Sequence, residues 1–206
     1  MNYIGKDLDT VWTRIFYHVW WPGQGNDPMY LANTSMNQTR NNYYENNYTP
    51  HMFTNGKDSG SNTNNWKSDP RDYLDDIGLY TVNLSGNRSG NDISFDVHLN
   101  ALKTTPNSKD LRLFVGAVMD TVKYPNSANG LSEHYDAVIE LLTGDTGTRI
   151  ELKSGVDKTE SFTWTMRSEW INHPDISWKI TGLKVVAWLQ DYSSKEVLQV
   201  NVLEID

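Results

Sequence analysis

The sequence after residue 76 alternates apolar and polar residues in segments of strand length, and this pattern constrains the fold more than any other feature. It is clear in "IGLYTVNLSG" and "NDISFDVHLNAL", and it is typical of antiparallel strands with one buried and one solvated face. The run "LRLFVGAVMD" (Leu111–Asp120) is almost continuously apolar, as a strand buried in a sandwich should be. Turn residues recur at roughly the 8–12-residue spacing of a sandwich. We therefore predict an antiparallel β-sandwich of Ig-like or jelly-roll type over residues 77–206.

Two hairpins are predicted within this sandwich. The residues "LSGNRSGN" (Leu84–Asn91) are predicted to form the loop of the first hairpin. The segments "LKVVAWLQD" and "KEVLQVNVLEI" flank the short turn "YSS" and predict a closing hairpin. Between the two hairpins, "TRIELKSG" and "ESFTWTM" alternate again and are predicted to be strands.

Residues 1–58 carry mixed helix and strand signals. The β-branched and aromatic run "TRIFYHVWW" (Thr13–Trp21) predicts a strand, and the turn residues of "PGQGNDP" end it. "HMFTNG" (His51–Gly56) predicts a second, short strand. The segment Met29–Glu45 predicts a helix, because four of its residues recur at fourfold spacing: Leu31, Ser35, Thr39 and Tyr43.

The segment from residue 59 to 76 opens as a polar loop. Ser68, with Pro70 just inside, has the features of a helix start and predicts a short helix to about Asp76. The sandwich segments begin directly after it.

Charge and composition narrow the classes of partner. The chain has 206 residues, with 18 basic and 26 acidic side chains and a net charge of -8. This acidic balance argues against a nucleic-acid partner and against docking on an anionic membrane, because both require basic surfaces. No apolar run approaches the length of a transmembrane helix, and the first residues lack the features of a signal peptide. The absence of cysteine excludes disulfides, thiolate metal ligands and a cysteine nucleophile in this chain.

Six landmarks follow one another along the chain in a distinctive order. They are "RIFYHVWWPGQGNDPMY", Arg40 followed by "NYY", "YTPHMFTNGK", "LRLFVGAVMD", "EHYDAVIELLTGDTGT" and "LKVVAWLQDYSSKEVLQ". In this order they resemble bacterial secreted and outer-membrane proteins that carry a thioredoxin-like module followed by a β-sandwich. The resemblance implies an α+β chain, with a partial thioredoxin-like α/β module over residues 1–76 and a β-sandwich domain over residues 77–206. It also implies a place in the cell envelope or outside the cell.

The chain departs from this family at its start. Family members usually begin with a strand and a helix that bears Cys-x-x-Cys, and this chain has no counterpart of most of that segment. By resemblance, the missing strand would lie between the strands at Thr13–Trp21 and His51–Gly56, so its loss would leave two internal edges unpaired. Three outcomes are open: the two strands close up, the N-terminal residues repack on the sandwich, or a second chain fills the gap. We expect repacking or a homodimer through the incomplete N-terminal sheet.

A candidate ligand face surrounds the first predicted strand end, because ligands bind at strand ends in α/β modules. By resemblance, Pro50 matches the proline that is cis in thioredoxin-like folds, and an ordinary trans proline before an edge strand is the alternative. The residues of this face are His18, Trp20, Trp21, Asp27, Tyr30 and Pro50. Alternatively, His18 and the tryptophans only pack the module and Asp27 caps the next helix. The sequence shows no nucleophile beside His18, so no catalytic residue is predicted.

The histidines give little sign of a metal site. The chain has five, and no two of them have a metal-ligand spacing such as H-x-x-x-H. "EHYD" brings Glu133, His134 and Asp136 together and could hold a cation. We favour the alternative, in which these residues form a solvated loop before the strand "AVIELL". No metal or other cofactor is predicted.

Three functions are consistent with these features. The first is a redox-inert, non-enzymatic protein with a binding or structural role at the bacterial cell envelope, with a protein or a glycan as ligand. The second is a fragment of a thiol-disulfide oxidoreductase-like envelope protein whose Cys-x-x-Cys lies upstream. The third is a carbohydrate-binding β-sandwich in which sugar rings stack on Trp170 and Trp178, whereas Trp188 lies in an apolar run and is predicted to be core. We favour the first.

Overall fold

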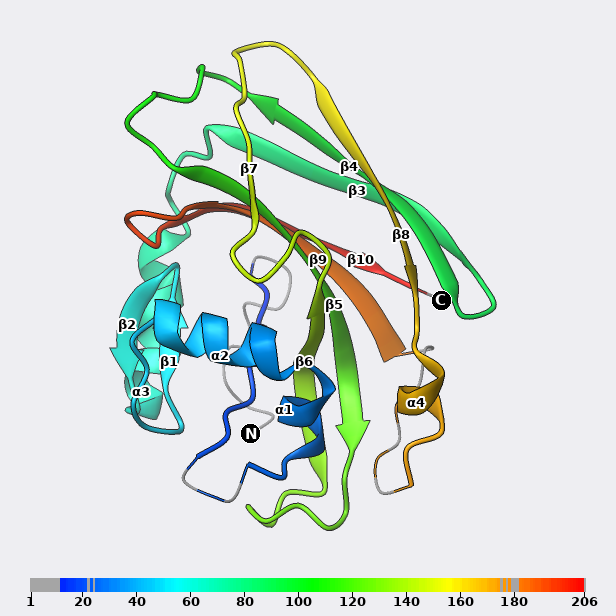
Figure 1. Cartoon of the computed structure of the whole chain (residues 1–206). Coiled ribbons are helices and arrows are strands. Elements are labelled where there is room, and N and C mark those ends of the chain that lie inside the picture. Colours follow the sequence, from blue (N-terminus) through cyan, green and yellow to red (C-terminus); the bar gives the residue numbers. More distant parts are fainter. Residues whose placement is uncertain are drawn as a thin grey trace.

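The computed structural model describes residues 12–21, 23, 25–174, 176, 178 and 182–205. In this part of the chain the fold is rich in antiparallel β-structure and has few helices, so the prediction of an α+β, mostly antiparallel fold is confirmed. Two twisted sheets lie one over the other, and helix α2 crosses the outer face of one of them (Figure 1). No helix in the described ranges is both long and apolar enough to cross a membrane.

The larger sheet has the strand order β10-β9-β5-β6, and β7 also pairs with β5. Its strands are β5 (Leu111–Lys123), β6 (Glu133–Leu141), β7 (Thr148–Arg149), β9 (Leu183–Asp191) and β10 (Val197–Glu204). All of these pairs are antiparallel. β9 and β10 are the predicted closing hairpin, and the predicted buried strand is β5, in the interior of the sheet.

The smaller sheet has the order β3-β4-β8 and is also antiparallel. β3 (Tyr80–Ser89) and β4 (Asp92–Ala101) form a long hairpin, and β8 (Lys158–Thr165) pairs along β4. The predicted loop over residues 84–91 is wrong in extent, because both strands continue to a tight turn at Gly90–Asn91. Gly90 has a φ of 64°, a conformation that glycine adopts without steric cost. Glycine, asparagine and serine suggest a loop in the sequence, but here they lie in a continuous cross-strand ladder.

The segment "TRIELKSG", predicted to be a strand, lies mostly outside regular strands. Its first two residues form β7, and Ser154 makes an isolated bridge with Ala101. Ile150 and Leu152 still bury their side chains in the main core. The alternating pattern here reflects burial along an extended connection, not pairing in a ladder.

The main core fills the space between the two sheets. β4 contributes every second residue from Ile93 to Ala101, β5 every second residue from Leu111 to Met119, and β9 every second residue from Leu183 to Leu189. Full burial of one large apolar side chain contributes about 1.5–3 kcal/mol. This burial holds the two sheets together and leaves the other face of the smaller sheet in solvent.

The opposite face of the larger sheet is covered by α2 (Thr34–Tyr43), which follows the short helix α1 (Pro28–Ala32). Met36 of α2 belongs to a second apolar cluster that includes Phe114 of β5 and Trp188 of β9. Because both faces of the sheet are covered, every residue of β9 is buried. The prediction that Trp188 is a core residue is confirmed.

The helix predicted at Met29–Glu45 exists, but it is interrupted at Asn33, whose side chain accepts a hydrogen bond from the Met36 amide and caps α2. Its buried face also differs from the predicted one. The four residues at fourfold spacing from Leu31 to Tyr43, which predicted the helix, are exposed or half-buried. The buried residues of α2 are Met36, Asn37, Arg40 and Asn41. Arginine and asparagine are normally surface residues, so apolar spacing could not identify this face.

Arg40 is only 1% exposed, and none of the ion pairs among the described residues includes it. Its guanidinium carbon lies 4.6 Å from the ring centre of Phe114, 4.7 Å from that of Tyr43 and 5.1 Å from that of Tyr44. Its Nη2 donates to the Tyr44 hydroxyl and to Oε1 of Gln190, both at 3.3 Å. Burial alone would lower the pKa of Arg40, but the surrounding tyrosines raise it above its usual value. No carboxylate of the described residues pairs with Arg40, and aromatic faces stabilise its charge instead.

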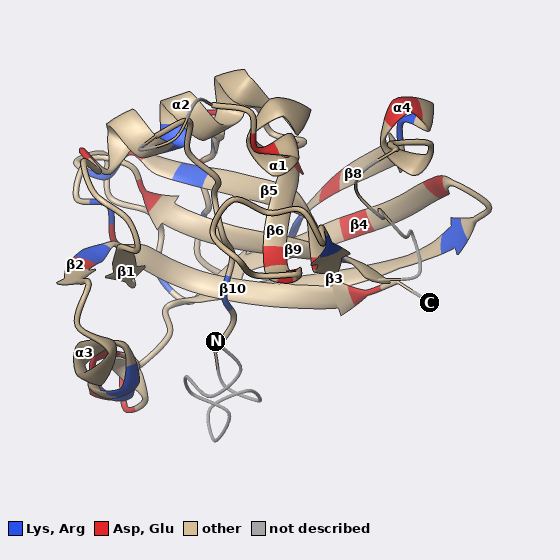
Figure 2. Cartoon of the chain, turned by 90° about the horizontal axis from the view of Figure 1, so that it is seen from below, with Lys and Arg blue, Asp and Glu red and all other residues tan. Residues whose placement is uncertain are grey.

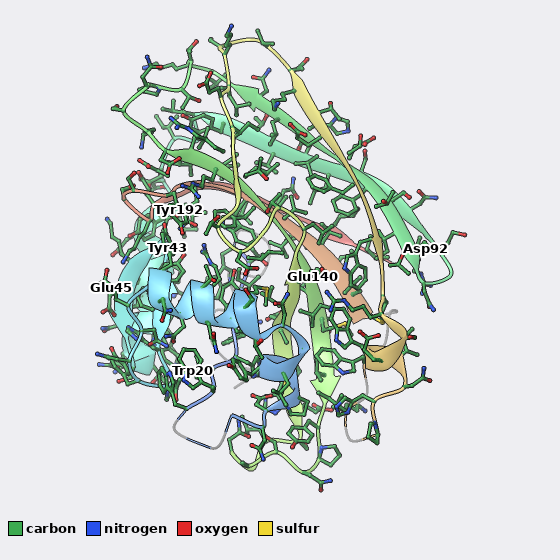
Figure 3. All side chains as sticks on the ribbon, in the orientation of Figure 1. Trp20, Tyr43, Glu45, Asp92, Glu140 and Tyr192 are labelled. Carbon is green, nitrogen blue, oxygen red and sulfur yellow. The ribbon has the colours of Figure 1, made fainter. Side chains whose placement is uncertain are left out.

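The C-terminal end of α2 is fastened to the turn between β9 and β10. The ring of Tyr43 stacks on Tyr192 with centres 4.3 Å apart, and the Tyr43 hydroxyl donates to the backbone carbonyl of Tyr192; Figure 3 labels both residues. Lys195 in the same turn forms an ion pair with Glu45 just beyond the helix. These contacts fix α2 over the sheet.

The N-terminal segment predicted as a strand at Thr13–Trp21 forms no regular strand. Phe16 alone makes a parallel bridge, in which its amide donates to the Asp136 carbonyl and its carbonyl accepts from the Val138 amide. Arg14 adds an ion pair with the Asp136 side chain at 3.4 Å. The described part of this segment therefore runs along β6 of the sandwich sheet, which matches the repacking outcome among the three. The homodimer stays a prediction.

A small hairpin follows α2. β1 (Met52–Thr54) lies within the short strand predicted at His51–Gly56, and it pairs with β2 (Lys57–Gly60). The Thr49–Pro50 peptide bond before it is cis. Gly56 has a φ of 84°, and a Cβ on it would overlap the backbone carbonyl of Lys195. The hairpin turn is thus pressed directly against the β9–β10 turn.

The helical segment between the small hairpin and β3 begins earlier than predicted. α3 (Thr63–Ser68) starts at Asn62, whose side chain caps it, and a 3₁₀ helix over Asp69–Tyr73 continues it. The predicted helix start at Ser68 is therefore the junction between the two. Trp66 of α3 is buried and donates its indole N–H to the Gly60 carbonyl, which joins the helix to β2.

Candidate functional site

His18 and Asp27 form the centre of the predicted ligand face. Nδ1 of His18 lies 2.8 Å from Oδ2 of Asp27, and Oδ1 of the same carboxylate accepts from the Met29 amide. Asp27 caps α1, as the alternative to a ligand role expected. Burial raises the pKa of Asp27, but the hydrogen bond and charge of His18 and the Met29 amide outweigh it, so the pKa lies below its usual value. Asp27 is therefore ionised at neutral pH, and His18 must donate from Nδ1.

The other members of this face divide into two groups. Trp20, labelled in Figure 3, lies 5.8 Å from the Tyr30 ring and 6.4 Å from the Trp21 ring, so these three surround the start of α1 with the His18–Asp27 pair. Tyr30 is buried, and its hydroxyl accepts from the Gln38 amide. Pro50 is exposed and precedes β1. Figure 1 shows β1 at the opposite end of α2 from α1. The structure does not bring Pro50 to the other five residues.

The two predicted stacking tryptophans lie in the interior. Trp170 and Trp178 are each 4% exposed, and their rings pack 6.2 Å apart. Trp164 lies 6.1 Å from Trp170 on the other side, and the Arg167 guanidinium lies 4.7 Å from the Trp170 ring centre. Neither Trp170 nor Trp178 presents a flat face to solvent, so a stacking platform would need a different conformation.

The residues of "EHYD" do not form the solvated loop predicted for them, because they are the first residues of β6. Asp136 is buried and pairs with Lys184 and Arg14. His134 is also buried, and its ring lies 5.6 Å from that of His18. Among the described residues, no group of three or more His, Asp or Glu side chains is placed to hold a metal ion together.

The outer face of the smaller sheet is a polar surface that sequence reasoning did not single out. Alternate residues of β3, β4 and β8 point away from the core, as the burial pattern of β4 shows. Figure 2 shows these strands mostly without charge, with isolated acidic and basic positions. The outward side chains are short and polar: Thr81, Asn83, Ser85, Asn87, Ser89, Asp92, Ser94, Asp96, His98, Asn100, Thr159, Ser161, Thr163 and Thr165. We call this set the polar face.

Hydrogen bonds across the strands order the polar face. Ser161 Oγ donates to Oδ1 of Asp96 at 2.6 Å, which links β8 to β4. His98 lies between Ser85 and Thr159, with ring nitrogens 3.1 Å from each hydroxyl, and so spans all three strands. Figure 3 labels Asp92, which accepts from the Thr165 hydroxyl near the end of the sheet. These contacts fix side-chain orientations before any ligand binds.

A hollow of about 410 Å³ lies over the middle of the polar face. Its lining residues come from all three strands and are Ser85, Gly86, Asn87, Ser94, Phe95, Asp96, Ser161, Phe162 and Thr163. A Cβ on Gly86 would overlap β4 at Phe95, so no larger residue fits there. The volume lies within the range of about 300–1,000 Å³ that is usual for small-molecule sites. The signal in the sequence was the row of serine, threonine and asparagine at outward positions of "YTVNLSGNRS" and "TESFTWT".

Comparison with known proteins does not assign the chain to a family. No protein-family model and no curated protein matches the chain. Among solved structures, a domain of the outer membrane lipoprotein Omp28 from Porphyromonas gingivalis is 15% identical with a TM-score of 0.42, covering 64% of this chain and 91% of that one.

Two further solved structures are more distant. The E. coli curli protein CsgC is 11% identical with a TM-score of 0.29, over 61% of this chain and 97% of that one. A beta-glucosidase from Listeria innocua is 15% identical with a TM-score of 0.31, over 63% of this chain but only 16% of the enzyme. None of these similarities assigns a family or a function to this chain.

Proposed function

We propose that this chain is a non-catalytic binding protein of the bacterial cell envelope and that the polar face over β3, β4 and β8 binds a neutral glycan. The observation that carries the proposal is the hollow of about 410 Å³, in which hydroxyl, amide and carboxylate groups from three strands converge.

The chemistry of the hollow favours a polyhydroxylated ligand. Sugar hydroxyls both donate and accept hydrogen bonds, and so do the serine, threonine and asparagine side chains that line it. Asp96 uses one oxygen for Ser161, and a carboxylate accepts up to about four hydrogen bonds, so it retains acceptors for a ligand. No lining residue is a cation, and phosphate or carboxylate ligands are typically held by arginine or lysine. A neutral ligand is therefore favoured over an anionic one.

The envelope location and the thioredoxin-like origin of residues 1–76 rest on the order of the sequence landmarks. α2 with Arg40, Tyr43 and Tyr44, followed by β1 and the Asn55–Gly56 turn, stands in the order that the resemblance implies. Fractionation of the native host, with immunodetection of the protein, tests the location. Detection only in the cytoplasmic fraction would contradict it.

A glycan array with the full chain, followed by calorimetry with the best oligosaccharide, tests the binding function. We expect Asp96→Asn to weaken binding, because Asn keeps the size and still accepts from Ser161 but loses the charge. Hydrogen bonds to charged groups contribute about 1.5–3 kcal/mol, which corresponds to roughly a tenfold to hundredfold loss of affinity.

Thr81→Ala is the matched control, because Thr81 lies on the same face of β3 but outside the hollow. It should bind as the unmodified chain does. An array with no ligand, or equal affinity of the Asp96→Asn variant and the unmodified chain, would contradict the proposal.

A further inference from the structure

His18 and His134 are far apart in the sequence, but the structure places them side by side. His18 lies in the N-terminal segment that runs along β6, and His134 is the second residue of β6. Their ring centres are 5.6 Å apart and the rings are inclined by 60°. Neither residue belongs to the polar face, so this pair is independent of the proposed glycan site.

Each imidazole has one ring nitrogen committed to an orienting partner. Nδ1 of His18 lies 2.8 Å from Oδ2 of Asp27, so Nε2 is the ring nitrogen of His18 left for another ligand. His134 hydrogen bonds to the backbone of Leu131. Its Nε2 is buried and has no hydrogen-bond partner among the described residues. A histidine that binds a metal through one nitrogen commonly donates the other N–H to a carboxylate or a backbone carbonyl, and both arrangements occur here.

The separation of the two rings suits a shared ion. Two imidazoles that bind one ion through Nε2 at about 2.1 Å, with a tetrahedral angle between them, have ring centres roughly 5–5.5 Å apart. The observed 5.6 Å is close to this value. The side chain of His134 is held in place by burial, since the residue is 8% exposed, and that of His18 is held by Asp27.

We propose that His18 and His134 bind one divalent transition-metal ion of the class that prefers imidazole nitrogen, with Zn²⁺ and Cu²⁺ as the best-suited ions. Asp27 is a positioning residue, because its contact with Nδ1 fixes the orientation of the His18 ring. Water completes the coordination, because Asp136 is already paired with Lys184 and Arg14. Hard ions such as Mg²⁺ prefer oxygen ligands and should not bind here. The site would tie the N-terminal segment to β6.

Calorimetric titration of the full chain with Zn²⁺ tests the site. We expect one ion per chain and no heat of binding with Mg²⁺. His18→Gln and His134→Gln should each weaken Zn²⁺ binding at least about tenfold, and Asp27→Asn should weaken it roughly tenfold to hundredfold. Asn is as good a helix cap as Asp, so Asp27→Asn leaves the start of α1 intact. His98→Gln, on the polar face, is the control and should leave the affinity unchanged.

A second measurement does not depend on whether the variants fold. The electron paramagnetic resonance spectrum of the unmodified chain with one equivalent of Cu²⁺ should show hyperfine coupling to two imidazole nitrogens. The proposal is overturned if the spectrum shows only oxygen ligands. It is also overturned if the His18→Gln/His134→Gln double variant binds Zn²⁺ as tightly as the unmodified chain, or if His98→Gln weakens binding as much as His134→Gln does.

Discussion

Arg40 allows an unusual prediction about substitution, because its charge is buried among aromatic rings and has no carboxylate partner in the part of the chain that the structure describes. Arg40→Ala removes the contacts with Phe114, Tyr43 and Tyr44 and opens a cavity. Large-to-small substitutions in a core cost about 2–5 kcal/mol, and hydrogen bonds from a charged group contribute about 1.5–3 kcal/mol. Because these contributions overlap, we expect the free energy of unfolding to fall by about 3–5 kcal/mol.

Arg40→Met separates the charge from the volume. Methionine fills most of the space and contacts the same rings, and it needs no hydrogen bonds. Tyr44 keeps its hydrogen bond from Nε2 of Gln190, so only Oε1 of Gln190 loses a donor. One unsatisfied buried acceptor costs about 1–3 kcal/mol. The Met variant should therefore be more stable than the Ala variant.

Arg40→Lys is the chemically conservative change, and we expect it to be as harmful as Ala. A lysine ammonium is strongly hydrated in the unfolded chain and loses this hydration when the chain folds. Burial of this kind lowers a lysine pKa by up to about 3–5 units. At 1.36 kcal/mol for each unit, a shift of this size corresponds to a loss of about 4–7 kcal/mol, which is at least as large as the loss expected for Ala. Urea unfolding followed by tryptophan fluorescence gives the three values by linear extrapolation. A Lys variant that is more stable than the Met variant would refute this reasoning, because the charge itself would then be required.

Two further predictions concern turns and pH. Gly56→Ala should destabilise the chain by more than Gly90→Ala, as measured by thermal unfolding. Both glycines have a positive φ, but only a Cβ on Gly56 would overlap neighbouring backbone. Equal losses of stability would contradict the close contact. Burial raises the pKa of Asp191, but its ion pair with Lys109 outweighs this and holds the pKa below its usual value. A carboxyl with a lowered pKa contributes stability above its unfolded pKa of about 3.9, and the contribution is lost as pH falls through the folded value. In Asp191→Asn and in Lys109→Met, the free energy of unfolding should therefore depend less steeply on pH in that acid range. An unchanged slope in either variant would contradict the pairing.

The sandwich strands were predictable from the sequence because each is long and strongly patterned. β5 and the β9–β10 hairpin carry continuous or alternating apolar residues over most of their length, so local preference and burial agree. The segment at Thr13–Trp21 has an equally strong strand preference, but only Phe16 pairs with the sheet. Whether an extended segment joins a ladder depends on an available edge, which sequence patterns do not encode.

The candidate sites were harder to predict for two different reasons. His18 and His134 come together only because the N-terminal segment lies along β6, and nothing in their sequence spacing indicates it. The polar face did leave a signal, since the outward positions of β3, β4 and β8 are serine, threonine, asparagine and aspartate, with His98 as the one exception. That signal is also what any solvated sheet face shows. The hollow appears only when the three strands are set side by side.

The most direct test of the proposed function is to map the glycan-binding surface by NMR. Amide chemical shifts of the full chain would be recorded with and without the oligosaccharide selected on the array. We expect the largest changes at residues that line the hollow, with Asp96, Ser94 and Ser161 among them, and little change along α2. Changes centred on α1 and α2, or no change in β3, β4 and β8 at saturating oligosaccharide, would contradict a glycan site on the polar face.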